Sequence, residues 1–220
     1  MEWREAGGVE WLEASLPGAR VAFSTRSAGS VKESHAALAD ALGLPADRVA
    51  TARQVHGAEL IFQGESPVEP VEADGHVLPE PGVAALVFAA DCLPVAVAGP
   101  GGVAMLHCGW RGLAAGIPAR GVAAVGATAA AIGPGIGACC YEVGDEVLAA
   151  FAPLGEGVAA GHMLDLTEVA RRLLFEAGVE RVQAAELCTS CDGNRFYSYR
   201  REGDAAGRQG GLAWLTPEKG

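Results

Sequence analysis

Three side chains that commonly bind transition metals stand in separate segments of the chain, each beside residues that break helices or strands. The segments are Gln54-Val55-His56-Gly57, Ala90-Asp91-Cys92-Leu93-Pro94 and His107-Cys108-Gly109-Trp110-Arg111-Gly112. Imidazole and thiolate are donors that zinc prefers, and three protein ligands keep a fourth position open for chemistry. Sequence spacing does not make the three converge. Taken singly, His56 is typical of a loop, and Cys92 and His107 are typical of a core.

Two carboxylates near these segments, Asp74 and Asp91, are candidates for proton transfer. General acid–base catalysis needs a titratable group next to the reacting atoms. Neighbouring residues of a strand point to opposite faces, however, so Asp91 is better placed to orient a ligand from behind than to act as the acid. Asp74-Gly75 is also typical of a simple turn, which is the more frequent role of that dipeptide.

The overall charge argues against nucleic acid as a partner. The chain of 220 residues has 27 Asp and Glu against 16 Lys and Arg, for a formal net charge of -11. Such a surface repels a phosphate backbone, although a few arginines gathered in a cleft can still bind a small anion. The first residues lack the features of an export signal, and the apolar region 82–110 is interrupted too often to span a membrane. We therefore expect a cytoplasmic protein without a membrane partner.

The six cysteines are expected to stay reduced, because a chain with a large core and no export signal keeps its thiols for metal binding or chemistry. Cys188-Thr189-Ser190-Cys191 is a lone CxxC pair, which can bind a metal or take part in redox chemistry. Because no second CxxC lies nearby, we expect buried or loop thiols there. The adjacent Cys139 and Cys140 are expected to be structural.

Short apolar runs bounded by glycine and proline predict a core rich in strands. The expected strands are 21–25, 59–62, 75–78, 83–89, 94–98, 103–107, 129–132, 179–187 and 196–199. The expected helices are 33–42, 112–125 with a bend near Pro118, 141–151 and 165–175. Asp165 and Glu168 form the N-terminal signature of the last helix, which is the clearest of them. We expect the rest of 64–81 to be a loop and the residues after Arg201 to be mobile, apart from Trp214.

The order of these motifs resembles the YfiH/laccase-domain family. The first half of the chain contributes Phe23-Ser24-Thr25-Arg26, Gln54-Val55-His56-Gly57, Ala73-Asp74-Gly75, Ala90-Asp91-Cys92-Leu93-Pro94-Val95 and His107-Cys108-Gly109-Trp110-Arg111-Gly112. The second half contributes Ile132-Gly133-Pro134, Cys140-Tyr141-Glu142-Val143-Gly144, Cys188-Thr189, Phe196-Tyr197-Ser198-Tyr199-Arg200-Arg201 and Gly207-Arg208. The resemblance therefore covers about the whole chain.

The resemblance implies that His56, Cys92 and His107 bind zinc. It implies phosphorolysis of purine nucleosides (adenosine, inosine and methylthioadenosine) together with deamination of adenosine in the same pocket. It also implies an α/β fold with α-β-β-α layers, in which a sandwich of mixed sheets is covered by helices and residues 1–220 form a single domain. A monomer is the default expectation.

Phosphorolysis needs cationic groups for the phosphate and donors for the departing purine. Arg26, in the Ser-Thr-Arg motif of the family, is the first candidate for a phosphate contact, although a surface arginine at a strand end is equally typical. Further candidates for substrate contacts are Gln54, Arg111, Tyr199 and Arg200. Each has a structural alternative, such as closing a loop, covering the start of a helix or packing in the core.

Two features depart from the family pattern. The loop after Arg26 is shortened, because Ala28-Gly29-Ser30 leads almost directly into a predicted helix. This change affects the expected sugar contacts. Cys108 stands where the family usually has alanine, and we expect its thiol to point away from the metal ligands.

Two other functions stay open. A copper-dependent polyphenol oxidase is the older description of the family, and copper(II) binds nitrogen and sulfur donors tightly. With five histidines and no His-x-His pair, the chain lacks the ligands of a four-copper laccase centre, so copper would have to take the zinc site. The second alternative is a non-catalytic zinc or redox module that acts through Cys188 and Cys191.

Overall fold

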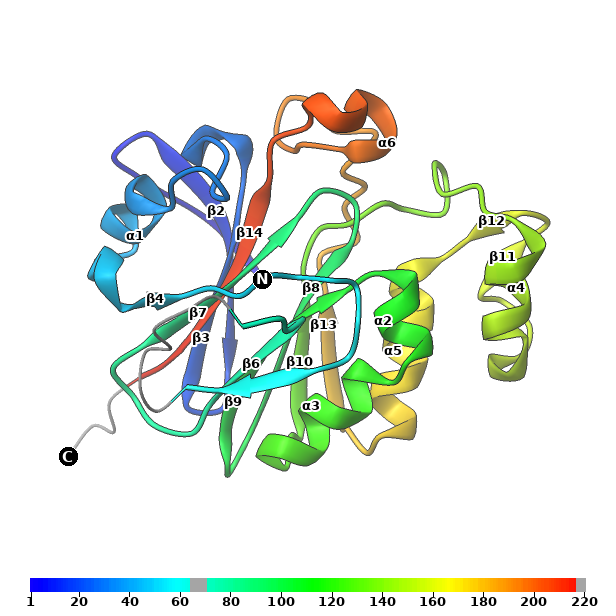
Figure 1. Ribbon diagram of the computed structural model, residues 1–220, viewed down its shortest axis with the longest axis horizontal. Coiled ribbons are helices and arrows are strands. Elements are labelled where there is room, and N and C mark those ends of the chain that lie inside the picture. Colours follow the sequence, from blue (N-terminus) through cyan, green and yellow to red (C-terminus); the bar gives the residue numbers. More distant parts are fainter. Residues whose placement is uncertain (64–70, 217–220) are drawn as a thin grey trace.

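Two six-stranded mixed sheets form the centre of the protein, as a computed structural model that describes residues 1–63 and 71–216 shows (Figure 1). In spatial order, the first sheet contains β1 (Glu2–Ala6), β2 (Val9–Leu16), β3 (Ala19–Ser24), β14 (Gln209–Leu215), β7 (Ala84–Ala89) and β4 (Val49–Ala50). The second contains β13 (Arg181–Ala184), β10 (Ala129–Ile132), β8 (Leu93–Gly99), β9 (Gly102–Cys108), β6 (Gly75–Leu78) and β5 (Leu60–Phe62). A small hairpin pairs β11 (Ala159–Ala160) with β12 (Met163–Leu164).

The two sheets face each other across a layer of small and apolar side chains. Phe23 of the first sheet and Met105 of the second are fully buried there, among alanines and valines from both sheets. Alanine-rich strands allow the sheets to approach closely, and the strands are apolar on both faces because helices cover the outer face of the second sheet. The predicted α/β sandwich is confirmed.

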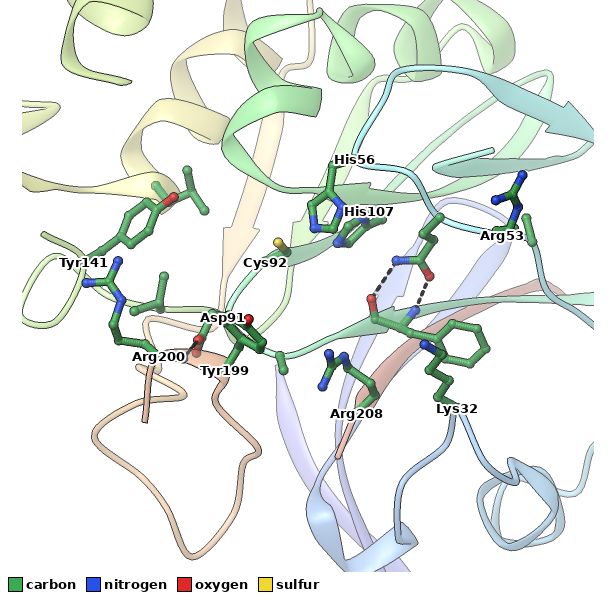
Figure 2. A pocket seen from close by; sticks show the side chains of 16 residues that line it. Lys32, Arg53, His56, Asp91, Cys92, His107, Tyr141, Tyr199, Arg200 and Arg208 are labelled. Carbon is green, nitrogen blue, oxygen red and sulfur yellow. Dashed lines mark hydrogen bonds between the residues drawn. The ribbon is translucent and has the colours of Figure 1, made fainter. Parts of the chain in front are cut away.

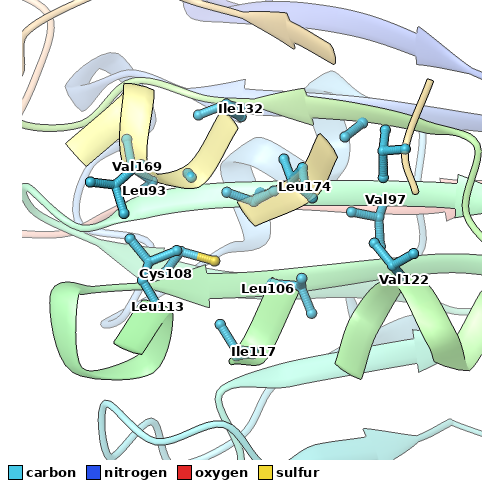
Figure 3. Close-up of a cluster of buried hydrophobic side chains, with 14 of the residues drawn as sticks. Leu93, Val97, Leu106, Cys108, Leu113, Ile117, Val122, Ile132, Val169 and Leu174 are labelled. Carbon is cyan, nitrogen blue, oxygen red and sulfur yellow. The ribbon is translucent and has the colours of Figure 1, made fainter. Parts of the chain in front are cut away.

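Three helices cover the outer face of the second sheet: α2 (Trp110–Ala114), α3 (Ile117–Val125) and α5 (Leu166–Glu176). Figure 3 shows the buried side chains between them and the strands, including Leu106, Ile117 and Leu174. The other helices are α1 (Ala36–Ala41) beside the first sheet, α4 (Asp145–Phe151) and α6 (Tyr199–Glu202). Four short 3-10 turns span Arg26–Ala28, Ala46–Arg48, Ala152–Leu154 and Gly203–Ala205.

The predicted N-terminal signature of α5 is confirmed. The Asp165 carboxylate accepts a hydrogen bond from the backbone N–H of Glu168 at 2.9 Å, which satisfies one of the unpaired donors at the start of the helix. The expected helix 112–125 is instead two helices, α2 and α3. Gly116 separates them in a left-handed conformation (φ 83°), and Pro118 lies in the first turn of α3, where its missing N–H costs nothing.

Two predictions for the C-terminal part are wrong. Residues 196–199 do not form a strand: Ser198 caps α6 by accepting from the N–H of Arg201, so the aromatic residues there flank a short helix. The residues after Arg201 include β14, which pairs with both β3 and β7 at the centre of the first sheet. The run Gly210-Gly211 conceals this strand in the sequence, because glycine is depleted in strands.

Several expectations concern residues or properties outside this description. The expected loop 64–81 falls partly on residues 64–70, which lie outside the described residues. The single domain of residues 1–220, the monomeric state and the cytoplasmic location stay predictions. Among the helices of residues 1–63 and 71–216, none combines the length and the apolar character that a bilayer crossing requires.

Candidate metal centre and its pocket

His56, Cys92 and His107 converge at one wall of a pocket, which is the grouping that the family resemblance implied (Figure 2). Their candidate ligand atoms all lie within 4.8 Å of one another, and the two imidazole rings meet edge to face with centroids 4.9 Å apart. His107 lies near the end of β9, and Cys92 directly precedes β8. The antiparallel register pairs Leu93 with Cys108, which brings the strand ends that carry the two ligands together.

His56 reaches the same point from the loop between β4 and β5, in a conformation that is rare for a residue with a side chain (φ 60°). The buried Asp74 carboxylate holds this conformation. It accepts hydrogen bonds from three successive backbone N–H groups, those of Val55 at 3.1 Å, His56 at 2.9 Å and Gly57 at 2.7 Å. Three amides gathered around one carboxylate form an anion-binding turn.

The same carboxylate contacts Nδ1 of His107 at 2.8 Å. Because the Asp74 carboxylate is an acceptor, Nδ1 carries the proton, and Nε2 is left as the atom that could bind a metal beside His56 and Cys92. Asp74 therefore positions two of the three ligands and does not line the pocket. The simple turn expected at Asp74-Gly75 is wrong, and proton transfer to substrate by Asp74 has no direct path in this geometry.

Charge interactions within this group outweigh burial. Burial alone would raise the pKa of the Cys92 thiol, but His107 and His56 beside it lower the pKa to about 6. Burial would lower the pKa of His107, but the Cys92 sulfur and the Asp74 carboxylate raise it to about 9. Burial would raise the pKa of Asp74, but the hydrogen bonds from His107 and the loop amides have the larger combined effect. The pKa of Asp74 is therefore below its usual value. The lowered pKa favours the thiolate of Cys92, which is the form that binds metals.

Asp91 also has an unusual backbone (φ 86°) and lines the pocket. Its carboxylate accepts from the Thr189 hydroxyl at 2.7 Å and from the backbone N–H of Arg200 at 2.7 Å. These bonds fasten the segment around α6 to the connection between β7 and β8. The hydrogen bonds of Asp91 thus hold the pocket wall, and neither of them reaches His56, Cys92 or His107, the ligands that Asp91 was expected to orient.

The pocket has a volume of about 440 Å³. Four cationic side chains line it, although the protein as a whole is acidic: Lys32, Arg53, Arg200 and Arg208. Figure 2 shows Lys32, Arg53 and Arg208 on one side of the metal ligands, and Tyr141 with Arg200 on the other. Among the described lining residues, Asp91 is the one carboxylate. The pocket is therefore suited to an anion next to an aromatic group.

Three of the five predicted substrate contacts line the pocket. Tyr199 does so while its hydroxyl donates to Asp204, and Arg200 does so while its guanidinium donates to the carbonyls of Cys140 and Glu142. Gln54 lines it too, but its amide group is paired at both ends with the backbone of Phe88, at 2.8 and 2.6 Å. The alternative that Gln54 closes its loop is therefore seen directly.

Arg26 and Arg111 lie away from the pocket lining. Arg26 donates to the carbonyl of Gly193 and to Glu202, and it stacks on Tyr197, so it ties α6 to the end of β3. Arg111 stacks on its neighbour Trp110 at the start of α2. The motif around an arginine does not show which way its side chain points, and for Arg26 the partners that hold the guanidinium lie far away in sequence.

Sequence analysis missed Lys32, Arg53 and Arg208 as pocket residues. Arg53 pairs with Glu72, whereas the Arg208 guanidinium donates to the carbonyls of Ala206 and Gly207. Gly207-Arg208 was among the motifs of the resemblance, and that was the available signal. Cys108 is as expected: its side chain is buried in the helix-covered cluster, away from the pocket (Figure 3).

Known proteins with similar sequences cover most of this chain. The family model described as "Multi-copper polyphenol oxidoreductase laccase" matches residues 21–216. The chain belongs to this family. A purine nucleoside phosphorylase of Xylella fastidiosa is 37% identical over 207 residues, covering 84% of this chain and 78% of that protein. The purine nucleoside phosphorylase YfiH of Escherichia coli is 34% identical over 175 residues, covering 74% and 72%.

The laccase-like family also provides a solved structure with the same fold. The crystal structure of Bacillus licheniformis YfiH superposes with a TM-score of 0.85 at 26% identity, covering 97% of this chain and 99% of that one. The family resemblance stated from the motifs is confirmed, and so is the fold that it implied. Membership and the two His/Cys groups support a metal in this protein.

Proposed function

We propose that this chain is a zinc-dependent purine nucleoside phosphorylase that also deaminates adenosine. The observation that carries the proposal is the His56–Cys92–His107 group in the wall of a pocket with four cationic side chains. The printed names of the Xylella and E. coli relatives supply the reaction class. A metal-only site would not need the cations, and an anion site alone would not need the metal ligands.

The donor set fits zinc. Two imidazoles and one thiolate match the ligands that zinc takes in proteins. Asp74 accepts from Nδ1 of His107 and fixes its ring, as carboxylates commonly do for histidines that bind zinc through the other nitrogen. Bound by three protein ligands, zinc would supply an open coordination position and Lewis acidity toward a substrate oxygen or water.

Phosphorolysis transfers the sugar from the purine to phosphate: a phosphate oxygen forms a bond to the anomeric carbon, the C–N bond breaks, and the purine leaves with a proton. We place the phosphate beside Lys32 and Arg208, whose charges offset its own. We place the purine toward Tyr141. Burial raises the pKa of Tyr141 to about 12, so its phenol stays a hydrogen-bond donor at neutral pH. Arg200, Tyr199 and Gln54 would border the nucleoside.

Deamination replaces the amino group of adenine by oxygen from water and releases ammonia, so a proton must move from the water to the leaving nitrogen. Asp91 is the carboxylate that borders the pocket in the described part of the chain, and we propose it for this transfer. Asp74 acts through His107 and His56 instead. Both reactions would use the same cavity.

A copper-dependent phenol oxidase is the alternative that the family description names. Within residues 1–63 and 71–216, the pocket contributes His56 and His107 as its imidazoles, while His35, His76 and His162 lie outside its lining. A four-copper centre needs more ligands than this site contains. The cation-lined pocket also favours a phosphate over a neutral phenol.

The test is a chromatographic assay of the zinc-loaded protein with adenosine, with and without phosphate. We expect phosphorolysis to release adenine only when phosphate is present. We expect deamination to form inosine even when phosphate is absent. His107→Ala should abolish both products. Arg208→Gln should raise the KM for phosphate at least tenfold with little effect on phosphate-independent deamination, because it removes one charge from the proposed phosphate site. Formation of neither product, together with phenol oxidation by the copper-loaded protein, would favour the oxidase.

A further inference from the structure

A second group of potential metal ligands lies outside the pocket. Cys139, Cys140, Cys188 and Cys191 bring four sulfur atoms together, all within 4.8 Å of one another. Cys139 and Cys140 belong to the segment between β10 and α4, and the other two belong to the segment between β13 and α6. We propose that these four thiols bind a zinc ion, distinct from the metal of the pocket, that fastens the two segments together.

The sulfur positions fit a tetrahedral metal site. The Sγ of Cys191 lies 3.5 Å from that of Cys139 and 3.4 Å from that of Cys140. In a tetrahedral zinc site with Zn–S bonds of about 2.3 Å, neighbouring sulfurs are about 3.8 Å apart. A disulfide would bring two of the sulfurs to about 2.05 Å from each other. Here the cysteines are free, and the Cys191 sulfur lies near two others at almost equal distance, an arrangement that a central ion shared by the sulfurs would explain.

The backbone around the cluster supports thiolates. The N–H of Gly137 donates to the Sγ of Cys188 at 3.3 Å, which places a positive dipole end against that sulfur. A side chain at position 137 would crowd the cluster, since a Cβ there would lie 3.2 Å from the Cβ of Cys188 and 3.4 Å from the Sγ of Cys139.

Two arginines hold the backbone of both segments. Arg200 donates to the carbonyl of Cys140 at 3.2 Å, and Arg201 donates to the carbonyls of Thr189 and Ser190 at 2.7 and 2.8 Å. A zinc ion with four thiolates has a net charge of about -2, and these two cationic side chains contact the same segments that would carry it. Four protein ligands leave no open position, so the site is structural.

The cluster stabilises one wall of the pocket. Its two segments carry Tyr141 and Arg200, and the hydroxyl of Thr189, one residue from Cys188, donates to Asp91. Zinc at the cluster would therefore fix the spacing between the proposed purine side of the pocket and α6. The proposal does not depend on the proposed reaction, because its test counts metal ions.

The test measures metal content after purification with a reductant and dialysis. We expect two zinc ions per wild-type chain, one in Cys188→Ser/Cys191→Ser, one in His107→Ala and two in the control Cys108→Ala, which removes a buried thiol outside both groups. Cobalt substitution gives a second measurement that needs no cysteine variant. The His107→Ala protein loaded with cobalt should keep the strong sulfur-to-cobalt charge-transfer absorption of several thiolates.

Two outcomes would overturn the proposal. One is a single zinc ion in the wild type that disappears in His107→Ala, with no thiolate-to-cobalt absorption left. The other is a disulfide within the cluster in protein kept under reductant, detected as a mass lower by two hydrogens per bond. Both outcomes leave the proposed reaction in the pocket untouched.

Discussion

At the scale of single residues, the candidate metal centre depends on backbone conformations that most side chains avoid. His56, a candidate metal ligand, has a φ of 60°. Asp91, which precedes the candidate ligand Cys92, has a φ of 86°. Such backbone conformations typically cost about 1–3 kcal/mol each. They persist where surrounding hydrogen bonds hold the backbone in place. The three amides on Asp74 do so for His56, and the bonds from Thr189 and Arg200 do so for Asp91.

Gly109 tests how tightly the ligands are packed. A Cβ at this position would lie 2.9 Å from the Sγ of Cys92 and 3.2 Å from the Cδ2 of His56. We expect Gly109→Ala to lower zinc affinity by about 10- to 100-fold, although the variant keeps all three ligands. Changes to residues that support metal ligands typically have effects of this size. Competition with a chelator measures the affinity.

Gly144→Ala is the matched control. Gly109 and Gly144 both cap a helix with nearly the same backbone (φ -80° and -81°), but a Cβ on Gly144 meets nothing within 4 Å. The control should bind zinc as the wild type does. Equal affinity in the two variants would show that the packing around Cys92 is looser than the structure indicates.

At the scale of elements, β14 and the hairpin of β8 and β9 decide where the pocket forms. β14 lies between β3 and β7, and Arg208 immediately precedes it, so the last strand places a pocket cation beside the first sheet. The β7–β8 connection crosses to the second sheet and carries both Asp91 and Cys92. The pocket therefore lies where the chain passes between the sheets.

The packing of β14 against the other sheet predicts a stability effect. A Cβ on Gly211 would lie 2.2 Å from the Cε of Met105 and 2.6 Å from the Cβ of Pro94. We expect Gly211→Ala to reduce the free energy of unfolding by about 1–3 kcal/mol through overpacking. Urea unfolding measures it, with Gly144→Ala as the comparison in open space. A loss within 0.5 kcal/mol of that comparison would mean that the sheets separate more easily than this contact implies.

At the scale of the whole molecule, buried polar groups link stability to pH. His76 in β6 is fully buried and its Nδ1 is 2.9 Å from the Nε2 of Gln63. Burial lowers the pKa of His76 from 6.5 to about 4. The unfolded chain therefore takes up a proton at a higher pH than the folded chain does. Folding is unaffected by this group above pH 6.5 and is destabilised as the pH falls from 6.5 toward 4.

The variant His76→Asn should remove this part of the acid sensitivity, because the Asn carbonyl can accept from Gln63 without titrating. The difference between 6.5 and about 4 corresponds to about 3 kcal/mol, so the wild type should lose about that much more than the variant between pH 7 and pH 4. Chelator-treated proteins are compared, so that metal release does not contribute. His162→Asn, at an exposed position, should follow the wild type. Parallel curves for wild type and His76→Asn would contradict the buried neutral histidine.

The sequence by itself determined the family, the layered α/β class and most of the strands, and through the family resemblance it predicted His56, Cys92 and His107 as metal ligands. Apolar runs such as 103–107 between glycines leave few alternatives to a buried strand, and ordered motifs over the whole chain specify one fold. The N-cap at Asp165 acts within four residues, so it too is visible locally. Local patterns suffice where the interactions are local.

Only the tertiary structure decided which charged and polar side chains face the pocket. Arg26 and Arg208 both stand at strand ends, yet partners 167 and 176 residues away hold Arg26 outside the pocket. Asp74 became a positioning residue because the His56 loop folds over it, and Cys139 and Cys191 met although 52 residues separate them. The direction of a side chain depends on partners distant in sequence, whose positions are fixed only when the two sheets pack.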